Sequence, residues 1–174
     1  MKRVERLLQD PLFQDYIARN VELEHGEKFC NHDLQHAIDV ARITYILVLE
    51  HQDLGYYINE AGLSGRLAAK ETIYAAGLLH DIGKWQEYRT GVDHAAYGSR
   101  LARQLLPLAY FNENEVNVIS QAIYEHRNIY KDMSFLGERL HRADNLSRAC
   151  LQCEFRHDCV KFKNKDMVAY LLVY

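Results

Sequence analysis

The fold of this chain is constrained most by how seldom its sequence contains a residue that breaks helices. Only two prolines occur among its 174 residues, and a proline inside a helix removes a hydrogen bond and clashes with the preceding turn. Pro11 follows Asp10, so this pair predicts an N-cap and the first position of a helix. Pro107 marks the end of another periodic segment. Because neither proline interrupts a periodic stretch, the sequence favours a fold built of long helices.

Apolar residues recur at helical spacing along most of the chain, as Leu34, Ile38 and Ala41 do. This spacing predicts helices over residues 11–24, 32–51, 67–82, 93–106, 112–126 and 135–150, and a shorter one near 165–172. Asn112 and Glu115 match a capping box at the start of the fifth helix. No stretch alternates strictly, and no Asn-Gly or Asp-Gly hairpin signal occurs. We therefore predict one all-α domain, a helical bundle spanning residues 1–174.

Charge and hydropathy exclude several kinds of partner. The 21 basic and 24 acidic residues give a formal net charge of -3 without any long basic block, so we expect no nucleic acid polymer as a partner. The apolar runs are too short to cross a bilayer, so we expect no membrane partner either. The opening MKRVERLLQD is amphipathic and contains acidic residues, unlike a secretory signal. A cytoplasmic location is therefore expected, and the oligomeric state is left open.

Six polar side chains fall where the helical periodicity predicts buried positions. They are His36, His80, Asp81, His94, His126 and Asp144. Taken singly, His36 could be a hydrogen-bonded core histidine, and His126 could interact with the dipole at a helix C-terminus. All six come from consecutive helices, however, and helical bundles build metal sites from side chains on facing helices. Imidazole with carboxylate suits Mn, Fe, Co, Ni or Zn, and carboxylate-rich octahedral sites also take Mg.

Three motifs, in this order, resemble the HD superfamily of metal-dependent phosphohydrolases. HDLQHAIDVAR contains His36, AAGLLHDIGKW contains the namesake pair His80 and Asp81, and HRADNLSR contains Asp144. The resemblance covers roughly residues 30–150 and leaves a cysteine-containing segment over residues 150–174. It implies that these four side chains bind one divalent metal ion.

Two further histidines match the two-metal branch of the superfamily, which includes symmetrical diadenosine tetraphosphate hydrolases and HD-type cyclic dinucleotide phosphodiesterases. They are His94 in DHAAYGSRLA and His126 in AIYEHR. The resemblance implies that Asp81 is a catalytic residue that bridges to a second metal ion held by these two histidines. The activity it implies is hydrolysis of a phosphoester or phosphoanhydride bond in a nucleotide or another small phosphorylated molecule.

The resemblance leaves other functions open. The paired histidines and the GYP signature of the cyclic dinucleotide phosphodiesterases are missing, since residues 137–139 are Gly-Glu-Arg. The HD-x-x-E-D pattern of guanosine tetraphosphate hydrolases is also absent, so neither substrate is expected. A minority of HD proteins use the same ligand set with two iron ions to cleave carbon bonds with dioxygen. A di-iron oxygenase is therefore one alternative, and a non-catalytic regulatory domain is another.

Several basic side chains lie close in sequence to these predicted ligands. Lys84, three residues after the HD pair, is either a phosphate contact in the catalytic site or a solvated lysine after a helix end. Arg127 and Arg148 could also contact the substrate. His32, one helical turn before the first ligand, could contact the substrate or hydrogen-bond a ligand. The remaining histidines are expected at the surface, namely His25, His51, His141 and His157.

The four cysteines form a second pattern of interest. Cys150 and Cys153 are three residues apart, Cys159 follows six residues later, and Cys30 precedes the helix that contains His36. In a reducing compartment such thiols favour metal binding over disulfides. Three of them, with Cys30 or His157 as a fourth ligand, fit a structural zinc site or an iron–sulfur cluster. The alternative is that they are reduced thiols that pack at a helix end.

Overall fold

The secondary structure of this chain is helical throughout the part that the computed structural model describes, which comprises residues 1–25, 31–148, 150 and 153–159. The all-α prediction is therefore confirmed. The helices are α1 (Lys2–Gln9), α2 (Pro11–Glu24), α3 (Leu34–Glu50), α4 (Leu54–Glu60), α5 (Arg66–Leu79), α6 (Lys84–Thr90), α7 (His94–Leu108), α8 (Glu113–Glu125) and α9 (Phe135–Leu146). The helix expected near residues 165–172 lies outside the described residues.

The helices begin where the sequence supplies side-chain caps. Asp10, Asp33 and Asp93 each accept a hydrogen bond from a backbone N–H in the first turn of the helix that follows. Asn112 and Glu115 form the predicted capping box at α8. These caps satisfy N–H groups that have no partner within a helix. The starts predicted at Asp10, Asp93 and Asn112 are confirmed, whereas the helix predicted from residue 32 begins at Leu34.

Three predicted helix ends are wrong by a few residues. The helix predicted over residues 67–82 is α5, and it ends at Leu79. The chain tightens there, because the Ile82 N–H donates to the Leu79 carbonyl. A separate short helix, α6, then begins at Lys84. The helix predicted over residues 93–106 is α7, which runs to Leu108 and includes Pro107 in its last turn. The helix predicted over residues 135–150 is α9, which ends at Leu146.

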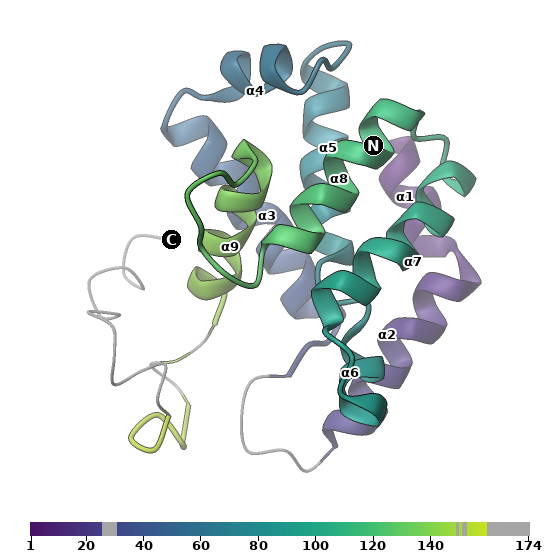
Figure 1. The fold of residues 1–174 in the computed structure, drawn as a ribbon, viewed down its shortest axis with the longest axis vertical. Helices are drawn as coiled ribbons and strands as arrows, with labels where there is room; N and C mark the ends of the chain where they lie inside the picture. The colour runs from purple at the N-terminus through teal and green to yellow at the C-terminus, as the bar shows by residue number, and fades with distance from the viewer. Residues whose placement is uncertain (26–30, 149, 151–152, 160–174) are drawn as a thin grey trace.

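Helix α5 lies at the centre of the bundle. Figure 1 shows α3 and α9 on one side of α5 and α8, with α1, α2, α6 and α7 on the other. The backbones of α3 and α5 approach closely because Gly77 has no side chain, and a Cβ there would lie 2.4 Å from the Ala41 Cα. This crossing brings His36, near the start of α3, close to His80, which directly follows α5.

The N-terminal helices are fixed to this bundle by buried polar contacts. Arg3 forms ion pairs with Glu71 of α5 at 2.6 Å and Glu115 of α8 at 2.5 Å. Asn20 of α2 is fully buried and donates to the Asp81 carbonyl at 2.9 Å. It also accepts a bond from the Trp85 N–H at 2.7 Å. Helix α2 is thereby attached directly to the turn between α5 and α6.

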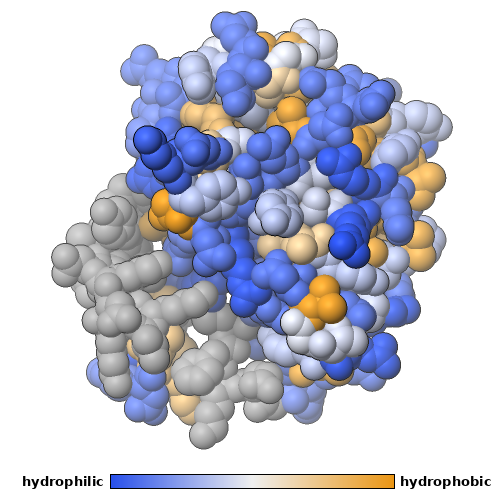
Figure 2. Space-filling model, in the orientation of Figure 1, coloured by the Kyte–Doolittle hydropathy of each residue, from blue (hydrophilic) through white to orange (hydrophobic). Residues whose placement is uncertain are grey.

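The surface is mostly polar on the face shown in Figure 2, where the coloured residues include hydrophobic side chains only as scattered spots. Isolated exposed apolar side chains of this kind are normal for globular proteins. None of the helices in the described ranges combines the length and the apolarity that a membrane span requires.

Candidate metal centre

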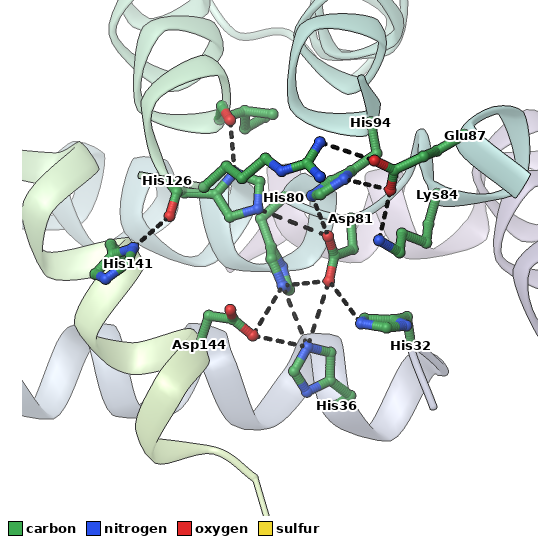
Figure 3. A network of polar contacts seen from close by, with 12 residues as sticks. His32, His36, His80, Asp81, Lys84, Glu87, His94, His126, His141 and Asp144 are labelled. Carbon is green, nitrogen blue, oxygen red and sulfur yellow. Dashed lines mark hydrogen bonds and ion pairs between the residues drawn. The ribbon is translucent and has the colours of Figure 1, made fainter. Parts of the chain in front are cut away.

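The turn after α5 places the HD pair in the interior of the bundle. His80 is fully buried, and its Nδ1 lies 2.7 Å from the Gly77 carbonyl. Because a carbonyl only accepts hydrogen bonds, Nδ1 carries the proton and Nε2 is left to face Asp81 Oδ2 at 3.0 Å. The Asp81 carboxylate therefore lies at the centre of the site, as Figure 3 shows.

One group of possible metal ligands surrounds Asp81 Oδ2. It consists of His36, His80, Asp81 and Asp144, whose donor atoms all lie within 4.8 Å of one another. His36 Nε2 lies 3.6 Å from Asp81 Oδ2 and 3.4 Å from Asp144 Oδ1. These side chains come from α3, the turn after α5, and α9, whereas the sequence placed His80 and Asp81 within the third predicted helix.

A second group surrounds the other carboxylate oxygen. It consists of Asp81, His94 and His126, again with donor atoms within 4.8 Å of one another. His94 Nε2 lies 3.2 Å from Asp81 Oδ1, and His126 Nε2 lies 3.6 Å from it. In Figure 3 these two histidines lie on the opposite side of Asp81 from His36 and Asp144. Asp81 thus faces one group of donors with each of its oxygens.

The donor atoms are oriented as metal ligands require. In each of the four histidines Nδ1 has a partner within the protein, and Nε2 faces a carboxylate. The Nδ1 partners are the Ser147 hydroxyl for His36, the Gly77 carbonyl for His80, the Glu87 carboxylate for His94 and the Ile123 carbonyl for His126. Such partners fix the ring orientation of metal-bound histidines. The residues present therefore fit one or two divalent cations.

Charge in the site is balanced by histidines and one arginine. Burial acts to raise the pKa of Asp81, but the surrounding histidines, His80 foremost, hold it well below its usual range. Burial acts likewise on Asp144, whose pKa the His36 hydrogen bond and the Arg148 charge hold well below its usual range. Burial acts to lower the pKa of His36, but its contacts with these carboxylates raise it to about 9. Both carboxylates are therefore ionised and available to a cation.

The predicted substrate contacts lie near the site, each with a carboxylate partner. Lys84 Nζ lies 2.5 Å from Glu87 Oε2, and its side chain is only 16% exposed, so it is not a freely solvated lysine. Arg127 pairs with Glu87 at 2.7 Å and with Asp93. Arg148 donates to both oxygens of a predicted metal ligand, Asp144, at 2.9 Å.

Two acidic residues near the centre were not predicted. Glu87 accepts hydrogen bonds from Lys84, His94 and Arg127. Burial acts to raise the pKa of Glu87, but Lys84 and His94 lower it. Glu24, at the end of α2, is buried and pairs with His32. The Lys84–Glu87 spacing of three residues indicates a pair on one helix face, but only if α6 itself is predicted.

The prediction for His141 is wrong. Its side chain is partly buried, and Nδ1 lies 2.6 Å from the His126 carbonyl. It comes from α9, which packs against α8 and covers that carbonyl. The other three histidines expected at the surface are exposed, namely His25, His51 and His157.

The cysteine site stays a prediction. Cys150, Cys153 and Cys159 are partly buried, and Cys30 lies outside the described residues. Among the described residues, the groups of possible ligands that gather within 4.8 Å contain histidine and aspartate only.

Comparison with known proteins agrees with this geometry. A family model described as the HD domain matches residues 33–149. The chain therefore belongs to the HD domain family. A solved structure, described as a predicted HD superfamily hydrolase from an uncultured Thermotogales bacterium, is 28% identical and covers 78% of this chain and 68% of its own, with a TM-score of 0.53. An HD-type metal-dependent hydrolase is thereby supported.

Two relatives differ in how much of their own length matches this chain. An uncharacterized protein of Clostridium beijerinckii is 35% identical over 91% of this chain and 92% of its own length. Ribonuclease Y of Staphylococcus epidermidis is 32% identical over 63% of this chain, and the match spans only 21% of that enzyme. This chain is thus similar to one protein along nearly its whole length and to ribonuclease Y through one part of it.

Proposed function

We propose that this protein is a metal-dependent phosphohydrolase with two divalent ions, which cleaves a phosphoester or phosphoanhydride bond in a nucleotide or another small phosphorylated molecule. The observation that supports it best is the position of Asp81, whose two oxygens face separate groups of ligands. Two divalent ions held a few ångströms apart orient a phosphoryl oxygen and lower the pKa of a water molecule. His36, His80 and Asp144 would hold one ion, His94 and His126 the other, and Asp81 both.

The basic side chains beside the centre support a phosphorylated substrate. Lys84 and Arg127 converge on the Glu87 carboxylate, and a phosphate group carries similar oxygen acceptors at a similar charge. We expect these two side chains to contact the substrate phosphate. Arg148, which pairs with Asp144, is expected to balance the charge of that ligand.

A small substrate is favoured over a polymer. The name of the ribonuclease Y relatives indicates RNA as their substrate, but this chain matches only about a fifth of those enzymes. With a net charge of -3, this chain lacks the positive charge by which proteins grip nucleic acid backbones. We therefore propose a small phosphorylated substrate, without a nucleic acid or membrane partner.

Elemental analysis combined with activity assays tests the proposal. Protein purified anaerobically should contain up to two divalent ions per chain and hydrolyse one class among model phosphodiesters, phosphomonoesters and nucleotides. Asp81→Asn should lose metal and lower kcat/KM by more than about 10²-fold, because loss of a group that only supports a metal ligand already costs about 10- to 100-fold. His51→Asn, at an exposed position, is the matched control.

Other results would point to other functions. Iron-specific turnover that consumes dioxygen, with no hydrolysis under argon, would replace this proposal with the di-iron oxygenase. Protein that binds no divalent ion under any loading condition would indicate a non-catalytic domain.

A further inference from the structure

His32 and Glu24 form a paired imidazole and carboxylate directly beside the candidate metal centre. His32 Nδ1 is hydrogen-bonded to Glu24 Oε1, and the His32 backbone N–H donates to Glu24 Oε2 at 2.7 Å. Both side chains are largely buried, at 11% and 3% exposure. The carboxylate therefore fixes both the position of His32 and the orientation of its ring.

Glu24 is itself held from two directions. Its carboxylate accepts a third hydrogen bond, at Oε1, from the Tyr88 hydroxyl of α6 at 2.9 Å. Asn20, one helical turn earlier on α2, donates a hydrogen bond to the Asp81 carbonyl and accepts one from the Trp85 N–H at the start of α6. The end of α2 is thus attached to the turn between α5 and α6, and this attachment fixes the position of Glu24 relative to Asp81.

The free nitrogen of His32 faces the reaction centre without joining either group of ligands. His32 Nε2 lies 3.7 Å from Asp81 Oδ2, on the side away from Asp144 in Figure 3. The two groups of possible ligands among the described residues do not include His32. Both His32 and Glu24 also precede the segment matched by the HD family, which begins at residue 33.

A buried imidazole with one nitrogen on a carboxylate and the other facing the reacting atoms is the arrangement of general acid–base catalysts. A metal ligand would lie within one of the two groups of possible ligands, and His32 does not. The described contacts of His32 therefore fit a proton donor better than a metal ligand.

We propose that His32 is the catalytic acid of the phosphohydrolase proposed above, on which this inference rests, and that Glu24 is its positioning residue. A water oxygen forms a bond to phosphorus. The bond from phosphorus to the leaving oxygen breaks, its electron pair stays on that oxygen, and the proton on His32 Nε2 passes to it. The proton that the attacking water releases replaces the one that His32 gave up. The net reaction consumes one water, and the imidazole is restored.

The dependence of rate on the leaving group tests this role. A series of substituted phenyl esters, of whichever phosphate class the wild type hydrolyses, varies the basicity of the leaving oxygen. In the wild type kcat/KM should depend weakly on that basicity. His32→Gln should lower kcat/KM by about 10²- to 10⁴-fold for the most basic leaving groups, the usual range for a lost general acid. For the p-nitrophenyl ester, whose p-nitrophenolate group leaves without a proton, the same substitution should lower kcat/KM by less than about 10-fold.

A second variant, a control and a metal measurement separate this role from others. Glu24→Gln should steepen the same dependence to a smaller extent, and it tests the pair independently should the histidine variant not fold. His25→Gln, at an exposed position next to Glu24, should match the wild type. The metal content of both test variants should equal that of the wild type.

Three results would overturn the inference. Equal rate loss across the whole ester series would show that His32 only binds or orients the substrate. Loss of metal in His32→Gln would make it a ligand. A wild type that binds metal but hydrolyses no phosphate ester would refute the proposed function, and the assignment of His32 would fall with it.

Discussion

Replacing Gly77 by alanine tests the idea that one missing side chain allows the metal centre to form. A Cβ at this position would lie 2.4 Å from the Ala41 Cα, 2.6 Å from its nitrogen and 2.7 Å from its Cβ. Real Cβ atoms do not approach other atoms so closely, and two of the three atoms are backbone. Helices α3 and α5 would therefore have to separate by on the order of 1 Å to restore ordinary contact.

The energetic cost is the difference between two effects. Overpacking in a core costs about 1–3 kcal/mol, whereas alanine in place of glycine in a helix gains up to about 1 kcal/mol. A net destabilisation of about 1–2 kcal/mol follows, which lowers Tm by roughly 2–8 °C for a chain of this size. His36 Nε2 and His80 Nε2, which lie 3.2 Å apart, would also separate. The affinity for the metal ion that these two side chains would hold should therefore fall.

Gly98→Ala is a suitable control because that glycine is also buried within a helix, but its added Cβ would meet no atom closer than 3.5 Å. It should leave stability unchanged or raise it. Urea denaturation of the metal-free proteins and calorimetric titration with Mn²⁺ measure both effects. A Gly77→Ala protein as stable as Gly98→Ala, with wild-type metal affinity, would refute the reasoning.

Three further predictions concern other parts of the molecule. Asn20→Ala removes two buried hydrogen bonds to the turn that carries Asp81 and should cost on the order of 2 kcal/mol; an unchanged urea midpoint would count against a role for this residue in holding α2. Arg3→Ala leaves two buried glutamates without their cation and should cost on the order of 3 kcal/mol, whereas Arg42→Ala, in an exposed pair, should cost less than about 1 kcal/mol. Because the pKa of His36 is raised to about 9 from 6.5, its protonation stabilises the metal-free fold below pH 6.5, and that contribution disappears as the pH rises through 9. Thermal melts of chelator-treated protein should record a loss on the order of 3 kcal/mol between these pH values, and a flat profile would contradict it.

Much of the fold could be predicted because its determinants are local in sequence. Asp10, Asp93 and Asn112 cap the helices that follow them by bonds to N–H groups two or three residues away. Such signals are visible in a short window of sequence. Helix α6 was missed because its seven residues are too few to show a period and follow α5 after a single turn.

The two groups of histidines and aspartates could also be anticipated, although not from any one residue. Each of these side chains is polar at a position where helical spacing predicts a buried, apolar residue. What could not be predicted is which acidic residues support them. Glu87 lies on a short helix with no period of its own, and Glu24 ends a helix whose packing depends on the long-range bonds of Asn20.

These two glutamates show why residue type alone does not define a role in this site. Glu87 holds His94 by Nδ1 and Glu24 holds His32 by Nδ1, so the two pairs have the same chemistry. They differ in where the opposite nitrogen lies. His94 Nε2 is 3.2 Å from an Asp81 oxygen and belongs to a group of ligands, whereas His32 Nε2 is 3.7 Å from the other oxygen and belongs to none. A metal ion can recruit the first imidazole, and the second is left to exchange a proton with the substrate.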